Sequence, residues 1–260
     1  MISKPLLKQT IKSNFKLFLI FTAVLCGLIS IVMTVFTPST MESINKSSGN
    51  LPFNPLGDIS TLINFLSNQY FGMFALIFAM IYLIIVGNSM IAGQVDKGNM
   101  AYNLSTPVTR TQITRTYVLF LVGSLTLMFA LIAAVGTGVA AITQPHVLNN
   151  AAFLRLTFGE YLLQFAISGI VFCASCIFSR SNRSLSFGAG LPIMFFATNL
   201  LAGMSKNLEF LKYFSLITLY DTKSIIGGQG YVVKFIVLGV MAIVLYIIGM
   251  KVFKEKDLPL

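Results

Sequence analysis

The chain has 260 residues, of which 56% are hydrophobic and 10% are charged, and its formal net charge is +10. Soluble domains carry about a quarter charged residues, so this composition excludes a soluble globular protein. The basic residues flank apolar segments and do not gather on a polar domain, which excludes a nucleic-acid-binding module. At roughly 20 apolar residues per membrane-spanning helix, the chain has room for six or seven spans and for no soluble enzyme domain beside them.

The first 16 residues form a basic lead-in to the first apolar segment. Lysines recur every four residues, at Lys4, Lys8, Lys12 and Lys16, with apolar residues between them. This pattern predicts an amphipathic helix that lies along the membrane surface, although the positive flank of an ordinary span has a similar composition. No small-residue cleavage site closes a short apolar core, so we expect no cleaved signal peptide.

Six apolar segments are each long enough to cross a membrane as a helix. Helices are favoured because hydrocarbon requires every backbone polar group to be hydrogen-bonded within the protein. We therefore predict an all-α integral membrane protein with one transmembrane domain, residues 1–260. Its spans are expected at about 17–36, 70–92, 117–142, 160–178, 185–204 and 232–250.

The distribution of Lys and Arg predicts the orientation of the six spans. With the N-terminus inside, the segments on the cytoplasmic side are 1–16, 93–116, 179–184 and 251–260. They hold twelve basic and three acidic residues, a balance of +9. The external segments hold six basic residues and five acids, Glu160 among them, a balance of +1. We therefore expect both termini in the cytoplasm and a multi-pass location in the cell membrane.

The two long external connections differ in composition. Residues 37–69 are rich in Pro, Ser and Asn, which predicts a loop. Residues 205–231 are half apolar but too charged to span, which favours a short re-entrant-like segment in the outer face of the membrane. In the third span, Ala130, Ala134 and Gly138 recur at four-residue spacing, a pattern that lets helices approach closely.

The sequence contains few residues or motifs of the kinds used for catalysis, metal binding or phosphate binding. No charged residue is expected near the middle of a span, which counts against a proton-coupled carrier or a voltage sensor. Gly93 and Gly98 have the spacing of a phosphate-binding loop, but Asn99 and Met100 stand where that loop needs Lys and then Ser or Thr. The single histidine, His146, cannot build a multi-histidine metal site. We therefore expect no catalytic, metal or cofactor-binding residues and no enzyme activity in this chain.

The connection at 93–116 is the most polar interruption in the first half of the chain. Gly98 is expected to end one helix, and residues 99–104 can form a short surface helix. Thr106 is then expected to cap the next helix, with Pro107 in its first turn. A rigid elbow of this kind can transmit force between a membrane helix and a partner below it.

This connection resembles the first cytoplasmic loop of the ABC-2-type permeases. In that family an acidic-x-x-Gly-Thr segment precedes Leu-Ser-x-Pro-Val-Ser/Thr-Arg. The corresponding segments here are Asp96-Lys97-Gly98-Asn99-Met100 and Leu104-Ser105-Thr106-Pro107-Val108-Thr109-Arg110. Gln94 stands where the family often has Glu, and Asn99 replaces the usual Thr. The order of elements along the whole chain also resembles that of the family: a basic surface helix, six spans, a long first loop and a half-apolar segment before the last span.

The resemblance implies a permease subunit that pairs with a second copy of itself or with a related permease. It also implies two separate cytoplasmic ABC ATPase subunits, which bind ATP and Mg²⁺. Spans two and five usually face the pathway in this family, which makes Asn88 and Asn199 candidate pathway residues. The residues expected to contact the ATPase are Asp96, Lys97, Gly98, Leu104, Ser105, Thr106, Pro107, Val108, Arg110, Gln112 and Ile113.

The resemblance also narrows the substrate. The Lys-, Asn- and Ile-rich usage is typical of low-GC Gram-positive bacteria, where small permeases of this type export amphipathic peptides, bacteriocins or hydrophobic drugs. The chain is similar to permeases of the staphylococcal exporter of phenol-soluble modulin toxins. The expected function is ATP-driven export of amphipathic or hydrophobic substrates across the lipid bilayer. The alternatives are a drug-exporting ABC permease, an ATP-independent carrier or channel, and a membrane assembly or immunity factor.

Overall fold

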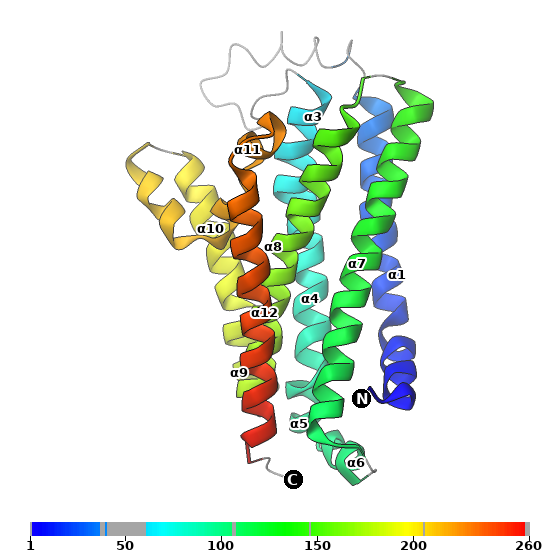
Figure 1. Ribbon diagram of the computed structural model, residues 1–260, viewed down its shortest axis with the longest axis vertical. Helices are drawn as coiled ribbons and strands as arrows, with labels where there is room; N and C mark the ends of the chain where they lie inside the picture. Colours follow the sequence, from blue (N-terminus) through cyan, green and yellow to red (C-terminus); the bar gives the residue numbers. More distant parts are fainter. Residues whose placement is uncertain are drawn as a thin grey trace.

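The computed structural model describes residues 2–36, 40, 61–105, 108–145, 147–204 and 206–257. In these ranges the chain is helical and contains no strand. Six helices of the described ranges are long and apolar enough to cross a membrane. They stand side by side in one bundle, with both termini at the same end (Figure 1). The chain is therefore an all-helical, multi-pass membrane protein.

The six predicted spans are confirmed as helices, and most extend beyond their predicted limits. The extension arises because polar and charged residues at the ends of each apolar segment continue the helix. Hydropathy therefore locates the apolar part of each helix better than its ends. The spans are α1 (Lys4–Val35), α3–η1–α4 (Leu62–Met90), α7 (Arg110–Thr143), α8 (Asn150–Ile177), α9–α10 (Ser181–Gly203) and α12 (Tyr231–Glu255).

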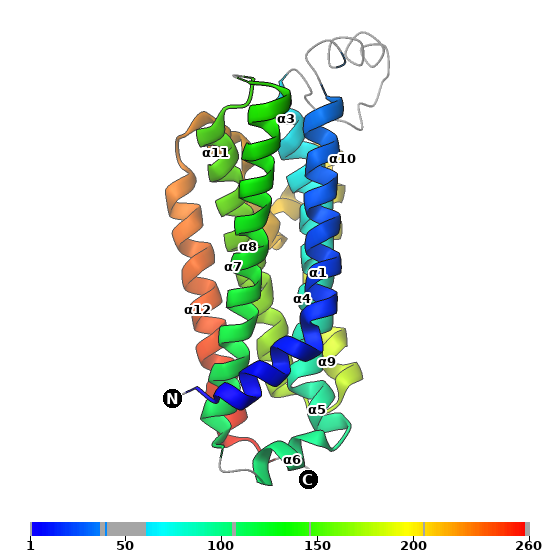
Figure 2. The ribbon, with the colours of Figure 1, turned by 90° about the vertical axis from the view of Figure 1, so that its right-hand side faces the viewer.

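The basic lead-in forms the first turns of α1, and these turns cross the bundle obliquely before the helix rises along it (Figure 2). Its four lysines are exposed, whereas Leu6, Thr10 and Asn14 are buried against the bundle. Thr10 Oγ1 donates to the carbonyl of Leu6 at 2.8 Å, and Asn14 Nδ2 donates to the carbonyl of Thr10 at 2.9 Å. Side chains that share helix carbonyls in this way bend a helix, which accounts for the change of direction.

The second span contains an unusual stretch of π-helix. It is built from α3 (Leu62–Phe65), the π-helix η1 (Leu66–Ala75) and α4 (Leu76–Met90). Its start contradicts the predicted loop at 37–69, of which residues 37–39 and 41–60 lie outside the described part. Leu62 and Phe65 are buried in the core. Their burial was not predicted because polar residues surround them in the sequence. π-Helical turns are rare and are frequent at functional sites.

The fourth span, α8, is the central helix of the bundle. In its most apolar window 72% of residues are buried, compared with 17–56% in the other five spans. It packs against α12, α4, α7 and α9, while α1 packs mainly against α7. Most side chains on α8 are therefore enclosed by the other spans.

Glu160, predicted as the first residue of the fourth span and counted with the external acids, lies well inside this central helix, so the count was wrong. Asn149 starts α8 ten residues earlier than the apolar segment does, because its side chain accepts a hydrogen bond from the N–H of Ala152 at 3.1 Å. Glu160 is 0% exposed. Arg155 also lies in α8 and Lys234 lies in α12, so the external connections outside these helices hold four basic and four acidic residues. The charge asymmetry that sets the orientation therefore remains.

The closest helix contact in the third span is at a different residue from the one predicted. Ala130, Ala134 and Gly138 lie on the exposed side of α7, so their spacing serves no contact within the described chain. Gly136 is the buried glycine. A Cβ atom there would lie 2.5 Å from Cζ of Phe153 on α8 and 2.9 Å from a side-chain carbon on α1. Three helices therefore approach one another at Gly136.

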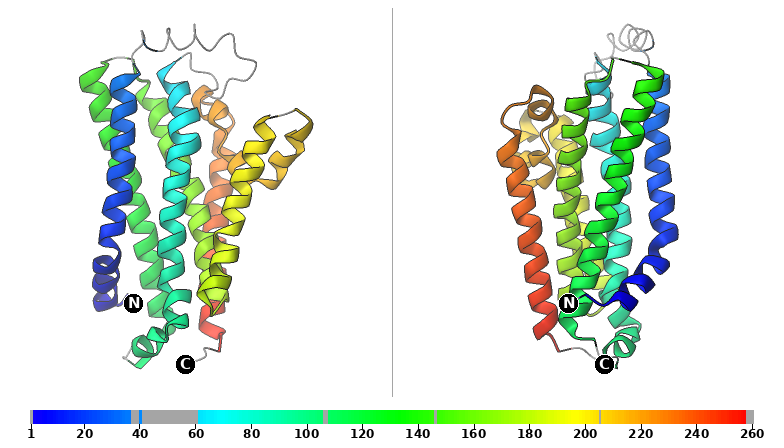
Figure 3. Two further views of the ribbon diagram at one scale, coloured as in Figure 1. Left: turned by 180° about the vertical axis from the view of Figure 1, so that it is seen from behind. Right: turned by 45° about the vertical axis from the view of Figure 1, so that its right-hand side comes forward.

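The segment before the last span folds back on itself. The 3-10 helix η2 (Lys206–Phe214) runs back along α10 (Gly190–Met204), and η3 (Leu216–Leu219) and α11 (Thr222–Gly227) then return to the end of the bundle (Figure 3). Ser215 Oγ fixes the turn by donating to the carbonyl of Phe195 at 2.8 Å. The described part of this segment is helical and turns back at Ser215; its position in the outer face of the membrane stays a prediction.

Candidate functional site

The predicted elbow lies at the end of the bundle that carries both termini (Figures 1 and 2). We define the elbow as α5 (Ala92–Asp96), Lys97, Gly98 and α6 (Asn99–Ser105). Gly98 has φ +73°, a left-handed conformation that glycine adopts without strain and that ends helices. The predicted helix stop at Gly98 and the short helix after it are therefore confirmed.

One face of the elbow is buried and the other is free. Met100 is fully buried in the core, while Asp96, Lys97, Asn99 and Tyr102 are exposed. Tyr102 is 78% exposed, although tyrosine is an amphipathic residue that usually covers part of its ring. A helical step of two residues from Met100 reaches the opposite face of α6, which is the signal that could have pointed to Tyr102 from the sequence.

The helix after the elbow begins later than predicted. Thr106 and Pro107 lie outside the described residues, but α7 starts at Arg110, so the prediction that Thr106 caps it is wrong. Thr109 is the cap. Its Oγ1 accepts from the N–H of Gln112 at 3.3 Å, and Gln112 Oε1 accepts from the N–H of Thr109 at 3.1 Å. The Thr-x-x-Gln spacing of this capping box was present in the sequence.

The elbow is bonded to the start of the fifth span. Asp96 Oδ2 accepts a hydrogen bond from the backbone N–H of Ser181 at 3.3 Å, at the first residue of α9. The first N–H groups of a helix lack partners within the helix and attract negative charge. Asn88 of α4 donates from Nδ2 to the hydroxyl of Ser181 at 2.7 Å. The elbow, α4 and α9 therefore meet at Ser181.

Two basic side chains link α7, α12 and α8 at the same end. Arg110 donates to the backbone carbonyls of Lys254 and Lys256 at the end of α12. Lys256 in turn donates from Nζ to the carbonyls of Cys176 and Ile177, at 3.2 and 2.8 Å, at the end of α8. Basic groups stabilise the unpaired carbonyls at helix C-termini. Burial lowers the pKa of Lys256.

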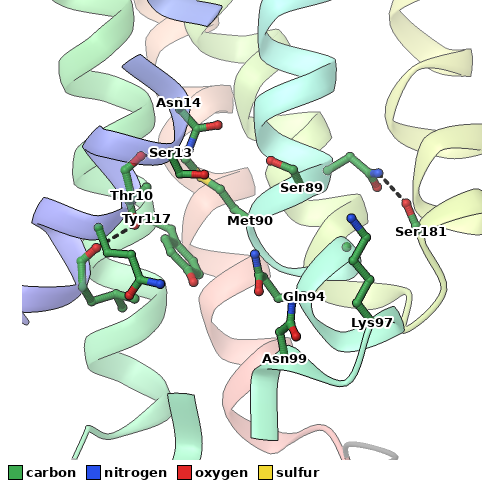
Figure 4. Close-up of a pocket in the computed structure, with 14 residues that line it drawn as sticks. Thr10, Ser13, Asn14, Ser89, Met90, Gln94, Lys97, Asn99, Tyr117 and Ser181 are labelled. Carbon is green, nitrogen blue, oxygen red and sulfur yellow. Dashed lines mark hydrogen bonds between the residues drawn. The ribbon is translucent and has the colours of Figure 1, made fainter. Parts of the chain in front are cut away.

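A polar cavity of about 380 Å³ lies beside the elbow, between α1, α4, α7 and α9. Figure 4 shows the side chains of Thr10, Ser13 and Asn14 on one side of it and those of Gln94 and Lys97 on the other. Buried Asn88, which is 7% exposed, also lines it, and its Oδ1 has no hydrogen-bond partner. We call this space the polar cavity.

A second cavity, of about 540 Å³, lies at the opposite end of the bundle. Its lining includes Asn199 and four charged residues, Lys212, Lys223, Lys234 and Asp221. We call it the lysine-lined cavity. Asp221 and Lys234 form an ion pair with an O–N distance of 2.8 Å. Burial opposes ionisation of Asp221, but hydrogen bonds from Lys234 and from Ser224 outweigh it and lower the pKa of Asp221 to about 2.

The residues predicted to contact a partner do not all share one exposed surface. Asp96, Lys97, Gly98 and Ser105 are exposed on the elbow. Ile113 is fully buried in the core and cannot reach a partner in this conformation. Val108 and Gln112 are partly buried, Arg110 is engaged with α12, and the side chain of Leu104 lies outside the described part.

The two predicted pathway residues are also separated. Asn88 lines the polar cavity and Asn199 the lysine-lined cavity, at opposite ends of the bundle. Among the described residues, no group of three or more His, Cys, Asp or Glu side chains could hold a metal ion; His146 lies outside them. Comparison of the chain with models of known protein families found no match, and comparison with curated proteins found none either.

Proposed function

We propose that this chain is the membrane-spanning subunit of an ATP-driven ABC-2-type exporter. Its elbow binds a separate cytoplasmic ATPase subunit, of which the complex holds two, and each ATPase binds ATP and Mg²⁺. The chain pairs with a second copy of itself or with a related permease. The substrates are amphipathic or hydrophobic molecules, in particular peptides such as phenol-soluble modulin toxins.

The observation that carries this proposal is the way the elbow is attached to the bundle. An exposed, rigid helical corner is useful for coupling only if a push on it reaches the spans. Asp96 joins the elbow to α9, and the helix that follows the elbow is joined to α12 through Arg110. Lys256 then joins α12 to the central helix α8. A displacement of the elbow is therefore passed through Asp96 to α9, while the hydrogen bonds of Arg110 and Lys256 join α7 to α12 and α12 to α8.

The charge distribution supports the orientation that this function needs. The lysines of the lead-in, Asp96 and Lys97 of the elbow, and the basic end of α12 all lie at one end of the bundle (Figure 2). The positive-inside rule places that end in the cytoplasm. A cytoplasmic ATPase then meets the elbow directly, and the re-entrant-like segment at 205–231 faces outward.

The two cavities support a pathway that opens alternately at either end. The polar cavity lies at the elbow end and the lysine-lined cavity at the other, and the second span contributes to both. Asn88 and Leu76 are twelve residues apart on α4, which corresponds to about 18 Å along a helix. Tilting the second span against α8 would therefore widen one cavity as the other narrows.

The proposal is tested by binding of a candidate ABC ATPase subunit to the purified chain. An exposed aromatic anchor of an interface contributes about 2 kcal/mol or more, so Tyr102→Ala should weaken ATPase binding more than about tenfold. The matched control is Tyr213→Ala, because Tyr213 is 93% exposed and lies on η2, far from the elbow (Figure 3). If both variants retain full ATPase binding, the elbow is not the docking site.

A further inference from the structure

Glu160 is a buried acid that the proposed function leaves without a role. It lies about 15 Å along α8 from the start of that helix, inside the central helix, and its side chain is 0% exposed. An acid within a membrane span is rare and marks an ion or proton pathway more often than a structural contact. Its immediate surroundings therefore decide what it can bind.

The carboxyl group of Glu160 is only half satisfied. Its Oε1 accepts a hydrogen bond from Nε2 of Gln164 at 2.9 Å, and the same Nε2 donates to the carbonyl of Leu76 at 3.0 Å. Glu160 Oε2 and Gln164 Oε1 have no hydrogen-bond partner in the described part of the chain. Buried acceptors without a donor are costly. This pair of side chains therefore has more acceptors than donors.

Among the described residues, the elements packed around Glu160 place no positive charge at its carboxyl group. From η1, Tyr70 donates its hydroxyl hydrogen to the carbonyl of Leu25 at 3.1 Å. From the segment after η3, Tyr220 donates its own to the carbonyl of Leu156 at 3.1 Å. These two phenols are the titratable groups that interact electrostatically with Glu160.

The other neighbouring helices are apolar at this level. On α12, the ring of Phe235 lies against Gly159, and on α4 the neighbour is Leu76. Arg155, five residues before Glu160 on α8, donates to the carbonyl of Ala151 at 3.1 Å, and Asp221 and Lys234 are paired with each other. No Lys or Arg of the described residues pairs with Glu160, so an ionised carboxylate here would be uncompensated.

We propose that Glu160 is a proton-binding site. In this conformation Oε2 carries a proton, which forms an O–H bond and leaves the side chain neutral. An isolated carboxylate costs several kcal/mol in such an interior, and binding a proton is the ordinary way in which a buried acid avoids that cost. The inference concerns this chain alone and does not depend on an ATPase partner.

The lysine-lined cavity is the route by which this proton is exchanged. Leu76 and Tyr220 form part of its wall, and the same two residues contact the Glu160 site from the other side. When the segment at Tyr220 moves away from Leu156, water in the cavity reaches Oε2 and accepts the proton. The three lysines and single aspartate of the lining give it a net charge of +2, which favours the carboxylate that remains. Opening of this cavity is therefore coupled to loss of a proton.

The experiment is infrared spectroscopy of the full chain in lipid nanodiscs, without an ATPase. A buried protonated carboxyl group gives a carbonyl band that carboxylates lack. We expect this band in the wild type at neutral pH, its absence in Glu160→Gln, and its retention in Glu255→Gln, which alters an exposed acid at the other end of the bundle. Tyr220→Phe removes the hydrogen bond from Tyr220 to the carbonyl of Leu156 and so loosens the cavity wall. Water should then reach the carboxyl group of Glu160 more readily, and the band should disappear at a lower pH than in the wild type.

Isotope labelling gives a second measurement that needs no variant. In the wild type, the band should shift when the chain carries ¹³C-carboxyl glutamate. The proposal is overturned if no band is present at neutral pH, or if Glu160→Gln retains it. It is also overturned if the signal follows the concentration of Na⁺ or K⁺ at fixed pH, because the site then binds a monovalent cation.

Discussion

Replacing Arg110 with alanine is expected to release the end of α12 from the start of α7. Arg110 Nη1 donates to the carbonyl of Lys256 at 2.5 Å and reaches that of Lys254 at 3.5 Å. The longer contact is at the limit of a hydrogen bond, so only one strong bond is lost. Removing a charged donor from a hydrogen bond costs about 1.5–3 kcal/mol. The site is partly exposed, so solvent screening keeps the effect near the lower end of this range.

Hydrogen–deuterium exchange of the last turn of α12 measures this effect directly. Exchange of these amides follows the local opening equilibrium, and 1.4 kcal/mol corresponds to about tenfold in that equilibrium. Arg110→Ala should therefore accelerate exchange near Phe253 about tenfold. The matched control is Arg115→Ala on the same helix, because the side chain of Arg115 is exposed and makes no hydrogen bond with the described residues.

The outcome for the two arginine variants separates a specific tether from a general effect of charge. If Arg110→Ala and Arg115→Ala accelerate exchange equally, lost charge and not the bond to α12 is responsible. If neither variant changes exchange, the hydrogen bond from Arg110 to α12 does not stabilise the end of that helix. The proposed coupling from the elbow to α8 through Lys256 is then refuted as well.

Three further changes test the packing, the capping and the ion pair. Gly136→Ala should destabilise the bundle by about 1–3 kcal/mol through overpacking, whereas Gly138→Ala, with nothing within 4 Å, should leave thermal unfolding in detergent unchanged. Thr109→Ala should cost about 1 kcal/mol and accelerate amide exchange in the first turn of α7, and Thr109→Ser should restore it. The pKa of Asp221 is lowered from 3.8 to about 2. Its ion pair with Lys234 is therefore complete above pH 3.8 and is lost as the pH falls through about 2. The protease resistance of this segment should fall between these two pH values in the wild type but not in Asp221→Asn.

The number and type of the membrane helices could be predicted because they depend on composition alone. Long apolar segments have no other stable form in lipid, and all six were located from the sequence. The ends of the helices could not be placed equally well. Capping groups such as Thr109 and Asn149 decide where a helix begins, and several polar residues compete for that role within each connection.

Contacts between distant segments were beyond sequence reasoning. The spacing of Ala130, Ala134 and Gly138 indicated a helix contact, yet the close approach occurs at Gly136, two residues before Gly138. Which face of α7 turns inward depends on the packing of α1 and α8, and periodicity within α7 does not contain that information. Glu160 was counted with the external acids for a related reason, since it is the first residue of the predicted span, whereas the helix starts ten residues earlier.

The sequence predicted where the elbow lies along the chain, but not the hydrogen bonds that connect this end of the bundle to other spans. The stop at Gly98 and the short helix after it follow from local conformational preferences. The bonds from Asp96 to α9 and from Lys256 to α8 join residues about 80 apart in the sequence. Nothing local marks such pairs, so only the folded structure could identify them.

The central claim is that ATP hydrolysis by a partner on the elbow drives export. The most direct measurement is uptake of a labelled amphipathic helical peptide into proteoliposomes that contain this chain and its ATPase, with the elbow facing the outer solution. We predict accumulation only with ATP and Mg²⁺, none with a non-hydrolysable analogue, and strongly reduced accumulation with Tyr102→Ala. Peptide accumulation that continues without ATP, or without the ATPase, would contradict the account and would identify an ATP-independent carrier.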